Sequence, residues 1–159
     1  MMKTINLIIF LLLIQWSCLK APEYPIEPII SFISVSNSVI KQSQFNGDST
    51  YITFGFTDGD GDLGDQDSVN IFVTDQRTNI HPTVYKIPFL KQNNGAKGIS
   101  GEIRIRLFSE CCIYPNGQVP CTPSTEFPTD TLIYSIYIKD RAGHQSNIIY
   151  TTPIVLLCQ

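Results

Sequence analysis

The chain has 159 residues, a formal net charge of −3 and only 16% charged residues. Its 11 basic residues are scattered along the sequence, which excludes the clustered positive surface of a typical nucleic-acid-binding protein. The hydrophobic fraction of 43% is sufficient for the core of one domain. Short runs of β-branched and aromatic residues, separated by 10 Gly and 10 Pro, predict an all-β protein.

Residues 1–17 have the features of a secretory signal peptide. Lys3 supplies a basic start, and residues 5–14 are almost entirely apolar. This run is too short to cross a bilayer as a helix, which needs roughly 20 residues. Cys18 directly follows the small Ser17, an arrangement that resembles a bacterial lipoprotein signal, in which the cysteine becomes the lipid-modified first residue of the mature chain. We therefore expect a lipid anchor on Cys18; the alternatives are plain secretion and an uncleaved anchor.

A proline-rich spacer follows the cysteine. Residues 19–28 contain three prolines, which disfavour a helix and favour an extended chain. We expect the segment 18–28 to tether a domain of residues 29–159 to the membrane. Within this domain, seven segments have the short apolar or alternating pattern of strands. They are residues 29–36 with an extension at 39–41, 50–57, 68–75, 83–90, 99–108, 131–139 and 147–157.

The strand pattern also indicates the architecture. In the second segment Ile52, Phe54 and Phe56 alternate with more polar residues and form the expected core face. Pro88 interrupts the fourth segment and therefore predicts an edge strand. About seven short strands separated by turn residues predict an antiparallel β-sandwich of the immunoglobulin-like or fibronectin III-like type.

An acidic loop follows the second predicted strand. Its five carboxylates within ten residues are those of Asp58, Asp60, Asp62, Asp65 and Asp67. No Lys or Arg occurs between Lys41 and Arg77, and like charges at this spacing repel unless a cation or water screens them. Calcium takes six to eight oxygen ligands and suits a loop that alternates Asp with Gly. The alternative is a solvated turn rich in Asp-Gly pairs.

The predicted topology adds a further residue to this site. The loop itself is not an EF-hand, because Leu63 and Val69 stand where an EF-hand needs glycine and glutamate. In an immunoglobulin-like sandwich, however, the loop between the last two strands lies at the same end as the acidic loop. We therefore expect Asp140, with Asn147 as a further neighbour, to face the acidic loop. A calcium ion there would stiffen the end of the domain that faces the membrane.

The cysteines other than Cys18 predict disulfides, because an even number in an exported chain is typical of bonded pairs. They are Cys111, Cys112, Cys121 and Cys158. A bond between the adjacent Cys111 and Cys112 closes a strained small ring, so one of the two is expected to pair with Cys121 and the other with Cys158. The CxxC spacing of a zinc site is absent. The topology places all four at the pole opposite the acidic loop.

Motifs of catalysis are absent from the sequence, which contains no GxSxG elbow, no HExxH and no Gly-rich phosphate loop. We therefore predict a protein that is not an enzyme, and we expect His144, a lone loop histidine, to be solvent-exposed. The alternative function is a carbohydrate-binding module, in which aromatic side chains of one sheet stack on sugar rings. The aromatic residues expected to point away from the core are Tyr51, Phe72, Tyr85, Tyr137 and Tyr150.

Two motifs give a family resemblance. Residues 56–64, FTDGDGDLG, and 138–147, IKDRAGHQSN, resemble the FxDxDGDxG loop and the D-x-AGN-x-S hairpin of small Ig-like lipoproteins of Bacteroidota. The cysteine-rich run of residues 111–123 also recurs in that group, whereas His144 replaces the usual asparagine of the hairpin. The resemblance implies an outer-membrane lipoprotein of a Gram-negative bacterium and is uninformative about activity. We predict a lipid-anchored domain of the cell envelope with a structural, adhesive or accessory role and an unidentified protein or glycan partner.

Overall fold

The computed structural model describes residues 23–80, 82–90 and 98–159 of the chain. In this part the protein is all-β and contains no helix, which confirms the predicted fold class at the level of a β-sandwich. The immunoglobulin-like subtype stays a prediction. The predicted signal peptide, Cys18 and the first residues of the spacer lie outside the described residues.

Ten strands occur in the described part of the chain, and all of them overlap the segments predicted from the sequence. They are β1 (Ile29–Val35), β2 (Val39–Lys41), β3 (Ser49–Asp58), β4 (Ile71–Asp75), β5 (Thr83–Tyr85), β6 (Ile99–Phe108), β7 (Thr129–Leu132), β8 (Tyr134–Ile138), β9 (Ile149–Tyr150) and β10 (Ile154–Leu157). The number exceeds the predicted seven because three of the predicted segments each contain two strands.

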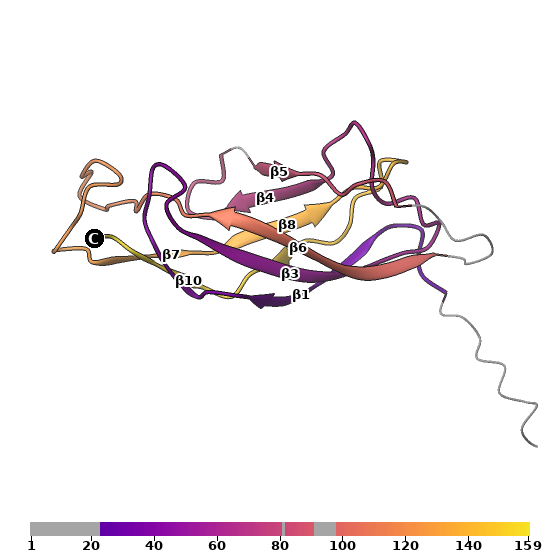
Figure 1. Ribbon diagram of the computed structural model, residues 1–159, viewed down its shortest axis with the longest axis horizontal. Helices are drawn as coiled ribbons and strands as arrows, with labels where there is room; N and C mark the ends of the chain where they lie inside the picture. The colour runs from indigo at the N-terminus through magenta and orange to yellow at the C-terminus, as the bar shows by residue number, and fades with distance from the viewer. Residues whose placement is uncertain (1–22, 81, 91–97) are drawn as a thin grey trace, which may run out of the picture.

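The strands form two layers around one core (Figure 1). One layer is the antiparallel sheet β1-β3-β6. The other contains the antiparallel sheet β5-β4-β8-β9 and the small sheet β2-β10-β7, in which β2 runs parallel to β10. The core between the layers includes Ile52 and Phe54 of β3 and Ile136 and Ile138 of β8, all of them fully buried.

The last two predicted strands each divide where the chain passes from one small sheet to the next. Residues 131–139 contain most of β7 and all of β8, and residues 147–157 contain β9 and β10. At the break, the Tyr134 N–H donates to the side-chain oxygen of Thr151 (3.1 Å) instead of to a backbone carbonyl. Pro153 has no N–H to donate to a ladder. The positions of these strands were therefore predicted correctly, but the prediction that each segment forms one continuous strand was wrong.

The fourth predicted strand is shorter than expected. It was predicted for residues 83–90, but β5 ends at Tyr85. Beyond it, the Ile87 N–H donates to the side chain of Asn70 (2.6 Å), which takes the place of a strand partner. β5 pairs with β4 alone, so it is an edge strand, as Pro88 indicated.

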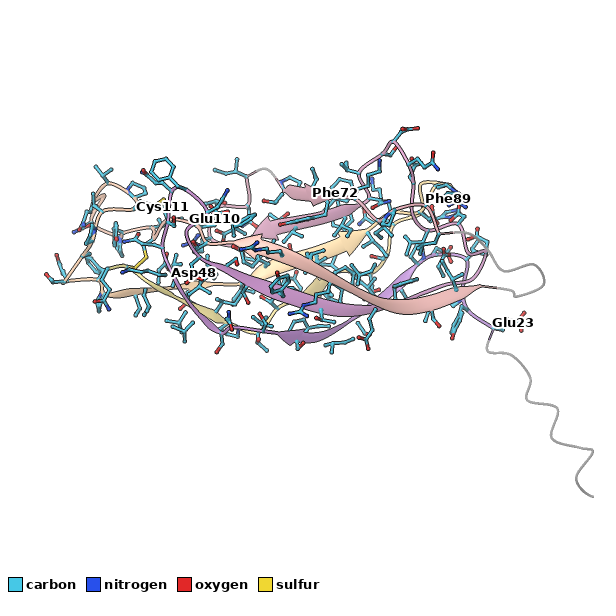
Figure 2. All side chains as sticks on the ribbon, in the orientation of Figure 1. Glu23, Asp48, Phe72, Phe89, Glu110 and Cys111 are labelled. Carbon is cyan, nitrogen blue, oxygen red and sulfur yellow. A yellow bond between two sulfur atoms is a disulfide. The ribbon has the colours of Figure 1, made fainter. Side chains whose placement is uncertain are left out.

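The structure confirms that the adjacent cysteines bond to Cys121 and Cys158, and it settles the choice that the sequence left open: Cys111 bonds to Cys121, and Cys112 bonds to Cys158. The second bond is fully buried and fastens the loop after β6 to the end of β10. Figure 2 shows Cys111 near one end of the elongated domain and Glu23 at the other. The disulfides and the N-terminal spacer therefore lie at opposite ends.

Candidate metal centre

Asp58 is buried because it continues the inward-facing side of β3. Ile52, Phe54 and Phe56 point into the core, and the two-residue period of a strand gives Asp58 the same direction. Asp58 is 0% exposed. A carboxylate thus stands where the strand pattern would place another apolar side chain.

Asp140 reaches the core in the same way from the opposite layer. Ile136 and Ile138 are the inward-facing residues of β8, and the alternation continues beyond the strand to Asp140, which is 8% exposed. Each layer of the sandwich therefore places one carboxylate at the same end of the core.

The acidic loop folds back over this end. Leu63 is fully buried and anchors the loop in the core. Gly64 has a φ of 89°, and a Cβ at this position would lie 2.2 Å from the carbonyl oxygen of Pro88, so the turn requires glycine. The Gly59 N–H donates to the carbonyl oxygen of Pro25 (2.7 Å), so the spacer touches the acidic loop directly.

Four carboxylates meet at this end: those of Asp58, Asp60, Asp62 and Asp140. One oxygen from each lies within 4.8 Å of the other three. Calcium binds oxygen at 2.3–2.6 Å, so ligands on opposite sides of the ion are separated by about 5 Å. The spacing therefore fits a single calcium ion, and the structure brings Asp140 to the acidic loop as the topology predicted. We call these residues the carboxylate group.

Two buried oxygens of the carboxylate group have no hydrogen-bond partner among the described residues. Asp58 Oδ2 accepts a bond from the Leu63 N–H (2.8 Å), but Asp58 Oδ1 accepts none. Asp62 Oδ2 accepts a bond from the Ala142 N–H (3.1 Å), but Asp62 Oδ1 accepts none. An ionised oxygen that is buried without a partner destabilises the fold, and a bound cation removes that cost.

The pKa values of the group shift as expected for crowded, buried carboxyls. Burial, reinforced by the neighbouring Asp60 carboxyl, raises the pKa of Asp58 to about 6. Burial also raises the pKa of Asp62, with the charges of Asp140 and Asp60 adding to the effect. Without a cation, the folded protein therefore favours protons on these carboxyls.

Arg141 lies beside the carboxylate group but is engaged elsewhere. Its guanidinium donates to the Gly64 carbonyl oxygen (2.8 Å) and lies 4.9 Å from the centroid of the Phe89 ring. Its charge lowers the pKa of Asp62 less than burial and the other carboxylates raise it. Arg141 thus joins the loop after β8 to the acidic loop and lowers the pKa of Asp62 only in part.

His144 is a neighbour of the site that the sequence prediction missed. Its Nδ1 lies 2.8 Å from Asp140 Oδ2, and its backbone N–H donates to Asp140 Oδ1 (2.8 Å). This hydrogen bond and the Asp140 charge raise the pKa of His144. The spacing of four residues across a tight turn at Gly143, whose φ is 92°, was the available signal. His144 holds Asp140 in place from the solvent side.

Asp65 and Asp67 lie outside the carboxylate group. Asp65 Oδ1 accepts hydrogen bonds from the N–H groups of Asp67 (2.7 Å) and Ser68 (3.0 Å), which lower the pKa of Asp65. Asn147 is also directed elsewhere, because its side chain bonds to the N–H (2.8 Å) and the carbonyl oxygen (2.9 Å) of Ile30 in β1. The first part of the acidic loop therefore supplies the carboxylate group, and the part from Asp65 onward forms a hydrogen-bonded turn.

The aromatic residues considered for sugar stacking divide between the two layers. Tyr51 belongs to β3, and the Arg104 guanidinium lies 4.2 Å from the centroid of its ring. Phe72 and Tyr137, in the other layer, stack on each other with centroids 4.8 Å apart. Tyr150 pairs with Ser135 on the same face of that sheet and is exposed, whereas Tyr85 is half-buried. Three of the five rings therefore share the outward face of the sheet β5-β4-β8-β9, and carbohydrate binding stays a prediction.

The metal-free protein is expected to lose stability as the pH rises from about 4 to about 8. The pKa of Asp58 is raised from its ordinary value of 3.8 to about 6 in the folded state. The contribution of this carboxyl to the free energy of unfolding is therefore complete below pH 3.8 and is lost as the pH rises through 6. His144 acts in the same direction, because its pKa is also raised and its contribution is lost above that value. Urea unfolding of metal-depleted protein between pH 4 and pH 8 measures the slope. Stability that increases over this range would contradict the prediction.

Comparison of the chain with protein-family models, with curated proteins and with solved structures gives no match. Among the described residues there is no helix that is long and apolar enough to cross a membrane.

Proposed function

We propose that this protein is a calcium-stabilised β-sandwich domain of the cell envelope, anchored to the membrane by lipid on Cys18, with a structural, adhesive or accessory role and no catalytic one. The observation that carries the metal part is the pair of buried oxygens, Asp58 Oδ1 and Asp62 Oδ1, that lack a partner within a group of four carboxylates. A cation at this point would be coordinated by both oxygens and would neutralise the repulsion between the four carboxylates.

Calcium suits this group better than magnesium does. Magnesium demands near-ideal octahedral geometry at 2.0–2.1 Å and keeps several of its waters, whereas calcium accepts six to eight oxygens in flexible arrangements. Asp58 and Asp140 are fixed by strands of opposite layers, while Asp60 and Asp62 lie in the loop between β3 and β4. The ion would therefore hold the two layers and the loop together at one end of the sandwich, which is a structural role.

Calcium is expected to raise the melting temperature of the fragment 19–159. A ligand that binds only the folded state stabilises it by about 2.7 kcal/mol at a concentration of 100 times Kd, which corresponds to about 10 °C for a domain of this size. Thermal melts at neutral pH with calcium, with magnesium and with chelator measure the effect, and magnesium should shift the melt much less. An unchanged melting temperature up to millimolar calcium would overturn the metal part of the proposal.

The lipid anchor has its own test. The chain expressed in a Gram-negative host is expected to incorporate a radioactive fatty acid and to sediment with the membranes. Cys18→Ala is expected to lose both properties, because the thiol is the site of attachment. Cys111→Ala with Cys121→Ala serves as the control, since it removes two cysteines and leaves the lipoprotein signal unchanged. Labelling that persists in Cys18→Ala would refute the anchor and leave the metal proposal intact.

A further inference from the structure

Three strands at the borders of the sheets are at least partly protected against pairing with another chain. β2 and β5 contain only three residues each, which is a common way to blunt an exposed edge. On the free edge of β1, the Asn147 side chain bonds to both the N–H and the carbonyl oxygen of Ile30. The two short strands and the bonded Ile30 therefore offer an added strand few free backbone groups.

β6 differs from them. It has ten residues and pairs with β3 on one side only. Just beyond the strand, the Ser109 N–H bonds to the Asp48 carbonyl oxygen, so odd-numbered residues of β6 direct their backbone groups toward β3. The Tyr85 hydroxyl donates to the carbonyl oxygen of Arg106 (2.8 Å) from the opposite side, which agrees with this assignment. The even-numbered residues therefore direct their N–H and C=O groups toward the free edge.

Two of these edge-directed residues have no backbone partner on that side. Among the described residues, no hydrogen bond reaches the backbone N–H or carbonyl oxygen of Glu102 or Arg104 from outside the β3 ladder. A cleft of about 510 Å³ runs along the same edge, between β6 and the segment after β5. Ile99, Ile103 and Leu90 are among its half-buried lining residues. An added strand would find both hydrogen-bond partners and apolar contacts here.

We infer that β6 is an interaction surface for the β6 strand of a second copy of this chain, paired antiparallel across a two-fold axis. In an antiparallel ladder, edge-directed residues must oppose edge-directed residues, so an even-numbered residue faces an even-numbered one. With the axis at Ile103, Glu102 of each copy faces Arg104 of the other. The two pairs carry opposite charges, and each pair exchanges two backbone hydrogen bonds.

The neighbouring registers lack this complementarity. An axis at Glu102 places two Glu102 carboxylates opposite each other, and an axis at Arg104 places two Arg104 guanidinium groups opposite each other. Like charges directly across a ladder are destabilising. The sequence of β6 is therefore self-complementary in one central register, which is the signature of an isologous two-fold contact.

Cross-linking of the full chain tests the register. Ile103→Cys places a thiol on the axis, at a pair that does not exchange hydrogen bonds and whose Cα atoms are about 4.5 Å apart, within the range of a disulfide. We expect a reducible covalent dimer on non-reducing gels of membranes that contain this variant. Ile99→Cys is the matched control, because its counterpart in the second copy lies several residues away. No dimer with Ile103→Cys, or equal amounts from both variants, would overturn the inference.

Charge exchange tests the same contact independently of the added cysteine. Glu102→Arg brings two pairs of like charges together and is expected to raise the dissociation constant of the purified full chain about tenfold in sedimentation experiments. Glu102→Arg combined with Arg104→Glu restores opposite charges and is expected to recover most of the affinity. Both side chains are exposed, so the fold is retained, which a thermal melt verifies. A monomeric parent chain, or a dimer that is indifferent to the exchange, would refute the contact.

Discussion

Asp58→Asn is expected to abolish stabilisation by calcium while making the metal-free protein more stable. Asp58 is 0% exposed, and its Oδ1 atom has no hydrogen-bond partner, so its charge opposes folding at neutral pH unless a cation is bound. The neutral amide keeps the shape and the acceptor for the Leu63 N–H, and its own N–H₂ group finds an acceptor in the adjacent carboxylates. The expected gain without calcium is about 1–3 kcal/mol in the free energy of unfolding.

The opposite signs of the two effects make the result specific. A variant that merely folds poorly would lose stability with and without calcium. Asp67→Asn is the matched control, because it removes the same charge from the same loop but lies outside the carboxylate group. It should leave the calcium-induced shift in melting temperature unchanged. A full calcium response in Asp58→Asn, measured by thermal melts at pH 7, would remove Asp58 from the site.

Removing the Cys112–Cys158 disulfide is expected to lower the free energy of unfolding by about 4 kcal/mol. The bond joins residues separated by 46 positions, and the loss of chain entropy on closing a loop of that length corresponds to this value. Both cysteines are fully buried, so the double variant Cys112→Ala with Cys158→Ala also loses packing in the core. Small domains have total stabilities of about 5–15 kcal/mol, so most of the stability is at risk.

The other disulfide provides the comparison. Cys111 and Cys121 are separated by only 10 positions, and neither is fully buried. Their double alanine variant is expected to lose less than 3 kcal/mol. Urea unfolding of the two double variants and the parent fragment ranks them directly. Equal losses from the two pairs, or a larger loss from Cys111–Cys121, would show that chain entropy does not determine the effect of these bonds.

The strand segments were predictable because the signals are local. Alternation in β3 and β6 and turn residues between strands place every strand of the described chain. The breaks were not predictable in this way, because they depend on partners that are distant in sequence. Tyr134 bonds to the Thr151 side chain and Ile87 to that of Asn70, and each bond forms only when the neighbouring strands of that sheet have paired. The disulfide pairing was predictable only in part, because the adjacent cysteines exclude one of the three possible arrangements and leave two.

The candidate site was predictable in part. The topology of a sandwich brought Asp140 to the acidic loop, but it did not separate Asp65 from Asp62. That separation results from a turn in which Asp65 accepts two backbone N–H groups. The burial of Asp58 follows from the sequence, since the alternation of Ile52, Phe54 and Phe56 continues to it, although the sequence analysis predicts that the strand ends at residue 57.

The bond between the Gly59 N–H and the Pro25 carbonyl oxygen limits the free length of the spacer. Residues 19–24 alone separate Cys18 from this contact, and a fully extended chain from residue 18 to residue 25 covers at most about 25 Å. With lipid on Cys18, the carboxylate group is confined to the layer of water next to the phospholipid headgroups. Anionic headgroups enrich divalent cations in that layer over a distance of about a Debye length. The occupancy of the site would then report the lipid composition beneath the protein as well as the calcium concentration of the surrounding medium.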